Sequence, residues 1–213
     1  MYQTQRIYDI FLAGGPLMWP LLACSLAVLT VVLERGLFWL QVERGRDRQL
    51  MDEILELART GDWEAIRDRT RGSRDYVIRM LVVGILHRDF SLVKAMEAEA
   101  EAILTRMRRR MGVLDTMITV APLLGILGTV TGIIHSFDML HAGGIADPRL
   151  VTGGIAQALI TTATGLGIAI VTVFPYNYFN SRIEHAAYVM EKYGTSLEVV
   201  HARLLQGRDH AAS

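Results

Sequence analysis

This chain of 213 residues lacks several residue types and motifs, and each absence excludes a class of function. Its single cysteine, Cys24, allows no disulfide within the chain and no cysteine-based metal site. The six histidines lack the spacing of metal ligands, so we expect no cofactor. No phosphate-binding loop, dinucleotide-binding glycine pattern, nucleophile elbow or catalytic triad is present, and we predict that the protein is not an enzyme.

Charge is missing from three long stretches, namely residues 11–33, residues 116–137 apart from His135, and residues 150–181. Each stretch exceeds the roughly 20 residues that a helix needs to cross about 30 Å of hydrocarbon. We predict an all-α membrane protein with three transmembrane helices and a helical cytoplasmic domain. The first stretch is too long for the apolar part of a signal peptide and has no cleavage site, so we expect a permanent span.

Basic residues predict the topology. Of 22 lysines and arginines, 16 lie within residues 35–115 and four lie after residue 181, which marks these regions as cytoplasmic. We expect a multi-pass protein of the bacterial inner membrane, with its N-terminus in the periplasm and its C-terminus in the cytoplasm. The expected segments are a periplasmic start (1–15), the first span (16–40), a cytoplasmic helical loop (41–115), the second span (116–140), a periplasmic turn (141–149), the third span (150–175) and a cytoplasmic C-terminal helix and tail (176–213).

The cytoplasmic loop has helical periodicity rather than the composition of a disordered segment. Gly61 predicts the end of one helix and Asp62 the cap of the next. A last helix, from about Ser91, is predicted to run unbroken into the second span, so that the second and third helices both extend into the cytoplasm. Glu97 and Glu101 lie four residues apart on one face of that helix. The basic run that ends at residue 110 is typical of an anchor to anionic lipid, more than of a nucleic-acid site.

The second span carries small and polar residues where lipid-facing helices have large apolar ones. Gly128 and Gly132 form a G-x-x-x-G face, which indicates close helix packing and is also compatible with a polar pathway. Thr129 lies near mid-depth, where its hydroxyl either bonds back to its own helix or serves such a pathway. Pro122 leaves one backbone carbonyl free for a neighbour or a water, or simply kinks the helix.

The third span has a matching pattern. Thr162 and Gly165 share one face, Thr161 lies beside it, and Gln157 lies one turn nearer the outside. Thr162 lies about twelve residues into the span, or ~18 Å along it, and we expect it to meet Thr129 near the midplane because the two spans run antiparallel. We predict that these residues line a polar pathway. No Asp, Glu, Lys or Arg lies deep in any span, so either the chain conducts no protons or a partner supplies the titrating carboxylate.

The sequence resembles the MotA/TolQ/ExbB proton-channel family over nearly its whole length, and within it the ExbB/TolQ branch. The motifs that carry the resemblance are A-P-L-L-G-I-L-G-T-V-T-G in residues 121–132 and G-I-A-Q-A-L-I-T-T-A-T-G-L in residues 154–166. Three spans with an external N-terminus are similar to ExbB and TolQ, whereas MotA has four.

The resemblance implies a homopentamer whose central pore, lined by the second and third spans, holds two single-span ExbD- or TolR-like subunits. Their membrane aspartate carries the proton, and Thr129 and Thr162 match the threonines that face it. Gln157 stands where family members often have glutamate, and glutamine cannot titrate. The implied function is a motor (stator) subunit that uses the proton motive force for work on a TonB- or TolA-like protein. The sequence does not distinguish protons from sodium as the transported ion. The alternative function is a membrane scaffold that conducts no ions.

Overall fold

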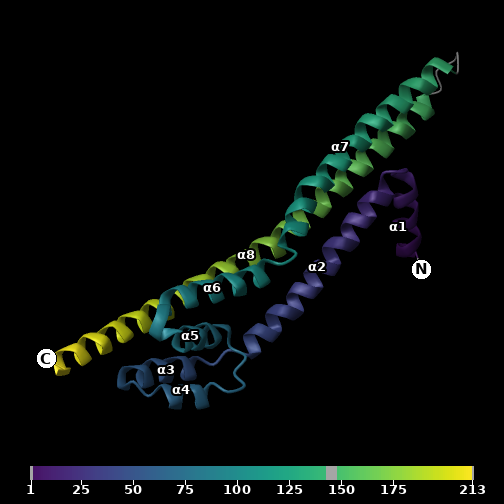
Figure 1. Cartoon of the computed structure of the whole chain (residues 1–213). Coiled ribbons are helices and arrows are strands. Elements are labelled where there is room, and N and C mark those ends of the chain that lie inside the picture. Colours follow the sequence, from purple (N-terminus) through teal and green to yellow (C-terminus); the bar gives the residue numbers. More distant parts are fainter. Residues whose placement is uncertain (1, 143–147, 213) are drawn as a thin grey trace. The chain divides into compact units, whose positions relative to one another are not determined.

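In the computed structural model, all regular secondary structure of the described residues is helical; these are residues 2–142 and 148–212, with side chains described for residues 8–138 and 152–206. These residues form eight helices and no strand (Figure 1). The helices are α1 (Tyr2–Ala13), α2 (Met18–Arg44), α3 (Arg48–Thr60), α4 (Trp63–Arg69), α5 (Tyr76–Leu86), α6 (Arg88–Arg108), α7 (Met111–Ala142) and α8 (Pro148–Ala212). The predicted all-α class is confirmed. The predicted turn over residues 141–149 lies largely outside the described residues.

Three helices are long and apolar enough to cross a membrane, as the charge-free stretches predict. They are Met18–Arg44, Met111–Asp138 and Thr152–Gln206. Large apolar side chains such as Leu26, Val130 and Ile170 are exposed along them, each with about half of its surface or more uncovered. A chain that leaves so much apolar surface uncovered needs lipid or partner helices around it. The protein is therefore a membrane protein with three spanning helices.

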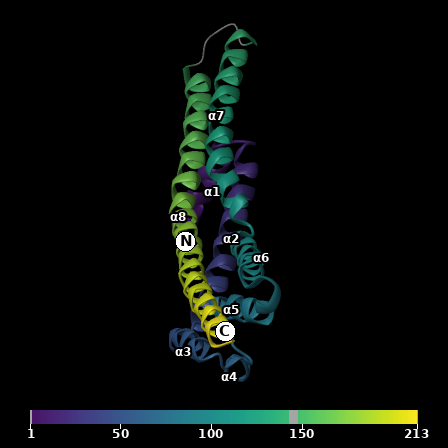
Figure 2. The same cartoon turned by 60° about the vertical axis from the view of Figure 1, so that its left-hand side comes forward.

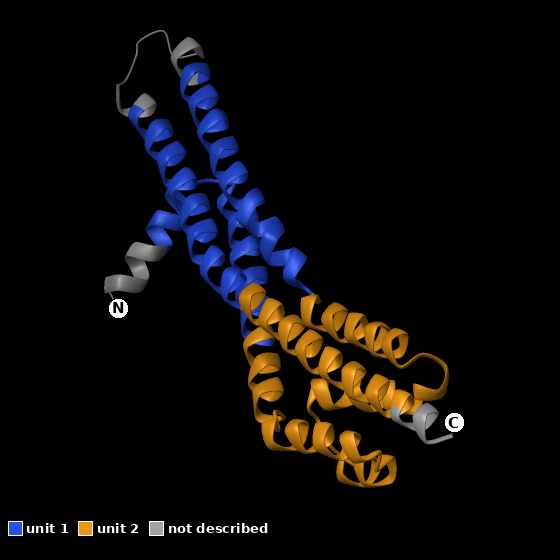
Figure 3. Cartoon of the chain, turned by 90° about the vertical axis from the view of Figure 1, so that its left-hand side faces the viewer, with its two compact units in different colours: residues 1–34, 110–178 blue, residues 35–109, 179–213 orange. Residues whose placement is uncertain are grey.

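The chain forms two compact units (Figure 3). Unit 1 comprises Met1–Glu34 and Arg110–Tyr178, and unit 2 comprises Arg35–Arg109 and Phe179–Ser213. Unit 1 contains the apolar parts of α2, α7 and α8. Unit 2 contains α3 to α6 together with the polar ends of α2 and α8.

Within unit 1, α7 and α8 run side by side (Figures 1 and 2). The start of α2 packs against them through a small apolar core of Met18, Leu21 and Ala121. Partly buried Phe11 at the end of α1 also packs on this core, and its ring meets that of Trp19 edge-on at 5.1 Å. The paired helices α7 and α8 thus form the framework of the unit, and the turn between α1 and α2 lies against them.

Unit 2 is held by helix caps and a buried carboxylate. The predicted cap and stop are confirmed, because Asp62 accepts a hydrogen bond from the Ala65 amide at 3.0 Å and Gly61 adopts a left-handed conformation with φ 74°. Asp75 is buried at the start of α5 and accepts from the backbone amides of Val77 and Asp47 at 2.8 and 2.9 Å. It also lies 3.5 Å from the guanidinium of Arg46, so one carboxylate joins the start of α5 to the segment that precedes α3.

The structure differs from the sequence expectation where the chain enters the second span. An unbroken helix was expected there, but α6 ends at Arg108, α7 begins at Met111, and Arg110 has φ 66° between them. The guanidinium of Arg35 donates to the carbonyls of Arg106 and Met107 at 3.5 and 3.3 Å, so that the end of α6 is capped by a distant side chain. Local propensity does not reveal such a contact. The expected continuation of the third helix beyond its apolar stretch is confirmed, because α8 continues to Ala212.

Candidate functional site

The closest helix contact in unit 1 is a seam of small residues between α7 and α8. A Cβ atom added to Gly125 would lie 3.0 Å from the Thr162 Cα, and one added to Gly132 would lie 3.1 Å from the Ala158 Cβ. A Cβ added to Gly165 would overlap the carbonyl oxygen of Ala121, a backbone atom that cannot rotate away. Glycines at these places allow the two backbones to touch, as the G-x-x-x-G pattern predicts.

The seam extends beyond the residues selected from sequence. Gly128 lies against the side chain of Thr161, and Gly154 lies against the hydroxyl of Ser136, so the contact continues toward the far ends of both helices. Gly154 and Ser136 belong to this contact but were not predicted from the sequence. A signal was available for Ser136, because it follows Gly132 by four residues, which keeps both on one helix face.

The three threonines make different hydrogen bonds. The Thr161 hydroxyl is buried and donates to the Ala158 carbonyl of its own helix at 2.8 Å. Thr129 also bonds back within its helix, to the Ile126 carbonyl at 2.6 Å. Thr162 instead donates across the seam to the carbonyl of Gly125 at 2.8 Å. A polar link between α7 and α8 therefore exists at mid-depth.

Thr129 and Thr162 are expected to meet, but each hydroxyl donates its hydrogen bond to a backbone carbonyl. Among the side chains that the structure describes, no hydrogen bond joins the two hydroxyls. The helix register places the two residues within about one turn of each other along the helix pair, because Thr162 lies against Gly125, four residues before Thr129, and Thr161 lies against Gly128. Both threonines are partly buried, one on each helix.

Pro122 lies inside α7 and does not interrupt it. Proline has no amide hydrogen, so the carbonyl four residues earlier loses its usual helical partner. The position is close to the Gly165 contact, because Ala121 is the residue that meets Gly165. The free carbonyl and the tight contact therefore occupy neighbouring turns of the same helix.

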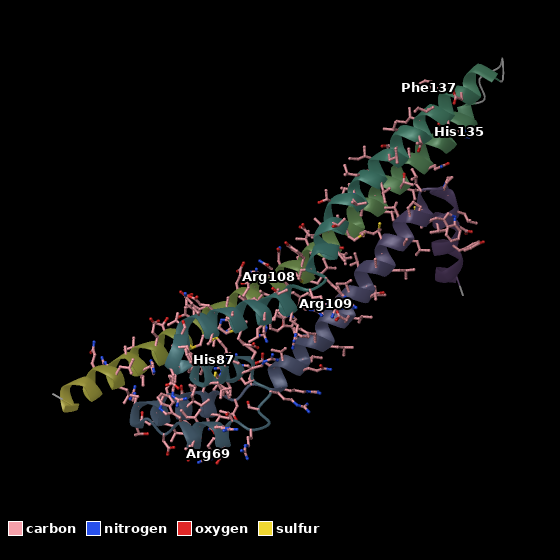
Figure 4. The ribbon with its side chains drawn as sticks, viewed as in Figure 1. Arg69, His87, Arg108, Arg109, His135 and Phe137 are labelled. Carbon is pink, nitrogen blue, oxygen red and sulfur yellow. The ribbon has the colours of Figure 1, made fainter. Side chains whose placement is uncertain are left out.

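Gln157 lies at a pocket of about 480 Å³ between the turn that joins α1 to α2 and the paired helices α7 and α8. Its side-chain amide packs directly on Gly15, where any Cβ would overlap it, and Gly15 has φ 72°. Polar groups of Thr131, Thr161 and His135 also line the pocket, and Figure 4 labels His135 near the end of α7. The contact between Gly15 and Gln157 has no sequence signal, because 142 residues separate them.

The site therefore combines hydroxyls, amides and glycines without a permanent charge. No acidic, basic or histidine side chain occurs in residues 116–134 or 152–181. Hydroxyls and backbone carbonyls can solvate a proton or a neutral acid, but they do not hold a proton at neutral pH.

Comparison with known proteins assigns the class. Residues 78–192 match the model of the MotA/TolQ/ExbB proton channel family. A Synechocystis protein described as biopolymer transport protein ExbB-like 1 is 37% identical over 206 residues, which cover 93% of this chain and 80% of that protein. A second Synechocystis relative, described as ExbB-like 3, is 34% identical and covers 90% of this chain and 93% of its own length.

A shorter match is to the Tol-Pal system protein TolQ of Haemophilus influenzae, which is 40% identical over 89 residues, or 42% of this chain and 37% of that protein. The chain belongs to the MotA/TolQ/ExbB proton channel family. Its class is thus that of transport proteins, and the resemblance inferred from the two motifs is confirmed.

Proposed function

We propose that this chain is the multi-span subunit of a proton-driven membrane motor in the bacterial inner membrane. It assembles as a homopentamer around a dimer of single-span ExbD- or TolR-like subunits that carry a membrane aspartate. Membership of the proton channel family supports the transported ion, and the names of relatives support an ExbB- or TolQ-like role. The basic bias of residues 35–115 and of the residues after 181 supports an orientation with both in the cytoplasm.

One observation carries the proposal, namely threonine hydroxyls near mid-depth in stretches of α7 and α8, residues 116–137 and 150–181, that have no carboxylate. Each threonine hydroxyl that donates to a carbonyl, as Thr162 does to Gly125, keeps lone pairs that accept a hydrogen bond. A protonated aspartic acid is a hydrogen-bond donor, and it crosses the membrane without the cost of a buried charge. In this proposal, Thr129 and Thr162 accept from the partner's protonated aspartic acid as it passes mid-depth.

Gln157 has a different role in this proposal. Its amide is held against Gly15 at the pocket near the ends of α7 and α8. An amide orients water and neither gains nor loses a proton near neutral pH, so Gln157 organises solvent at the approach to the pathway. The residues of the seam, including Gly128, Gly132, Gly165 and Thr161, keep α7 and α8 in the register that sets the two hydroxyls within about one turn of each other.

The energy is sufficient for mechanical work. One elementary charge that moves through 100 mV releases about 2.3 kcal/mol, so several protons per cycle supply enough free energy to rotate or shift the partner helices. The force would then pass to a TonB- or TolA-like protein. Sodium is the competing ion, and replacement of protons by sodium in the same assay distinguishes the two.

The experiment is a flux measurement in membrane vesicles that contain this chain alone, or this chain with the single-span protein encoded beside it. We expect voltage-driven proton flux only when both proteins are present, and none when the partner's membrane aspartate is changed to asparagine. A non-conducting scaffold, the alternative function, predicts equal leak in all three preparations. Purification of the complex in mild detergent should give five copies of this chain, and a stable monomer would contradict the pore.

A further inference from the structure

Unit 2 has an unfilled groove between α6 and α8. It encloses about 490 Å³ and has a floor of small and apolar residues that includes Met96, Ala100 and Gly194. Four acidic side chains stand around this floor, two from each helix, and they are Glu97, Glu101, Glu191 and Glu198. We call these residues the acidic groove. Its volume accommodates several side chains of another molecule.

The acids of the groove have no internal partner. Within residues 8–138 and 152–206, none of the four forms an ion pair or a side-chain hydrogen bond, whereas Glu99 on the same helix pairs with Arg79 at 2.7 Å. All four are exposed. Four like charges around an apolar floor repel one another and favour a ligand that brings positive charge together with apolar groups.

A second surface of unit 2 has the complementary character. A pocket of about 540 Å³ between α3 and α8 is lined by Leu55, Val199 and Leu204, with Arg59 and Arg203 at its edges. Among the described side chains, Arg59 pairs only with Glu56 in its own helix, through a contact at 3.1 Å in which both side chains are about two-thirds exposed. Arg203 has no ion pair among the side chains that the structure describes. We call these residues the basic face.

The two surfaces lie on opposite sides of one helix. The α8 residues that line the acidic groove are Ala187, Met190, Glu191, Gly194, Thr195 and Glu198, and those that line the basic face are Ser196, Val199, Val200, Arg203 and Leu204. Successive residues of an α-helix turn by about 100°, which places the mean directions of these two complete sets roughly 180° apart around the α8 axis. A molecule with complementary surfaces on opposite sides binds its own copies head to tail.

We propose that the acidic groove receives the basic face of a second copy of this chain, and that repetition of this contact closes the cytoplasmic part of the ring. The contact is heterologous, since a two-fold contact would place one acidic groove against another. The inference deepens the proposed function, because it names the cytoplasmic contact of the homo-oligomer on which that function rests. Arg203 and Arg59 of one copy then lie beside the acids of the next.

Cross-linking in native membranes tests the contact. In a Cys24→Ala background, Glu101→Cys lies in the groove and Arg203→Cys on the basic face. A bis-maleimide that spans about 10 Å is suitable, because an Arg–Glu pair holds its Cα atoms farther apart than the ~7 Å that a disulfide allows. A chain with both cysteines should give a ladder up to the full ring. Two differently tagged chains with one cysteine each should give only mixed dimers, and either alone should give none.

The control pairs Glu64→Cys with Arg203→Cys, since Glu64 is exposed on α4 and lines neither surface. This pair should give no ladder. Absence of a ladder from the test pair, with both thiols reactive toward a maleimide dye, would overturn the proposal. Cross-links to a different protein in place of a second copy would also overturn it, because they would identify another occupant of the groove.

Charge reversal gives an independent test that needs no cysteine. Glu198→Arg or Arg203→Glu alone should lower the yield of full-size assembly by about tenfold, and the two together should restore it to within about twofold, because each reversal places like charges across the contact. Glu64→Arg is the control and should change nothing. Normal assembly with both single reversals contradicts the contact while it leaves the motor proposal intact. If the unaltered complex shows no proton flux, the motor proposal is contradicted. The cross-linking ladder still tests the contact between copies in that case.

Discussion

The seam between α7 and α8 makes a sharp prediction at Gly165. A methyl group at this position would overlap the carbonyl oxygen of Ala121, and carbon–oxygen contacts in proteins lie near about 3.3–3.6 Å. The two backbones would therefore have to separate by roughly 1 Å. Overpacking of this kind costs about 1–3 kcal/mol, whereas the helix propensity of alanine returns up to about 1 kcal/mol.

The matched control is Gly167→Ala, two residues further along the same helix. A Cβ atom at Gly167 meets nothing within 4 Å, so that only the favourable propensity remains. Thermal unfolding of the purified complex should show a lower melting temperature for Gly165→Ala and an equal or slightly higher one for Gly167→Ala. Separation of α7 from α8 should also lengthen the hydrogen bond from Thr162 to Gly125 and reduce proton flux. Equal melting temperatures and equal flux for the two variants would refute the close-packed seam.

Three further predictions concern individual groups. Gln157→Ala should reduce flux less than threonine substitutions do, because an amide that orients water is partly replaced by water itself; complete loss of flux would place the polar site nearer the pocket. Asp75→Ala should destabilise unit 2 by about 3 kcal/mol in chemical denaturation, since two amides and Arg46 lose a buried partner, whereas the exposed Asp68→Ala should stay within about 0.5 kcal/mol. Burial raises the pKa of the Tyr76 phenol above its ordinary value, and the positive charge of Arg46 opposes this shift. The contribution of the neutral phenol to folding stability is therefore complete below about pH 10 and is lost as pH rises through the folded-state pKa. Tyr76→Phe should show less loss of stability between pH 9 and pH 11.

Composition and local chemistry predicted much of this fold. The three spans followed from charge-free stretches, and the stop at Gly61 with the cap at Asp62 followed from short-range preferences of glycine and aspartate. Gly132 and Gly165 were also found from sequence, because close packing of membrane helices needs small residues at regular spacing.

Long-range contacts explain what the sequence did not predict. The break at Arg110 depends on Arg35, which caps the end of α6 from 71 residues away. The packing of Gln157 on Gly15 depends on how the turn between α1 and α2 folds back, and no local pattern encodes it. Thr162 donates a hydrogen bond to Gly125 and not to Thr129. This choice depends on how α7 and α8 are aligned along their axes, and the helical periodicity of the sequence does not determine that alignment to better than one turn.

The central claim is that the two hydroxyls at mid-depth serve the partner's proton-carrying carboxyl group. Proton flux through vesicles that contain the partner and the Thr129→Val, Thr162→Val double variant tests it most directly. Thr30→Val is the matched control, because Thr30 is exposed on α2 and bonds back to the Leu26 carbonyl at 2.7 Å. We predict that flux falls at least about tenfold in the double variant, the effect of about 1.4 kcal/mol in the barrier, while the control conducts normally and both complexes keep their mass. Normal flux in the double variant would contradict the account.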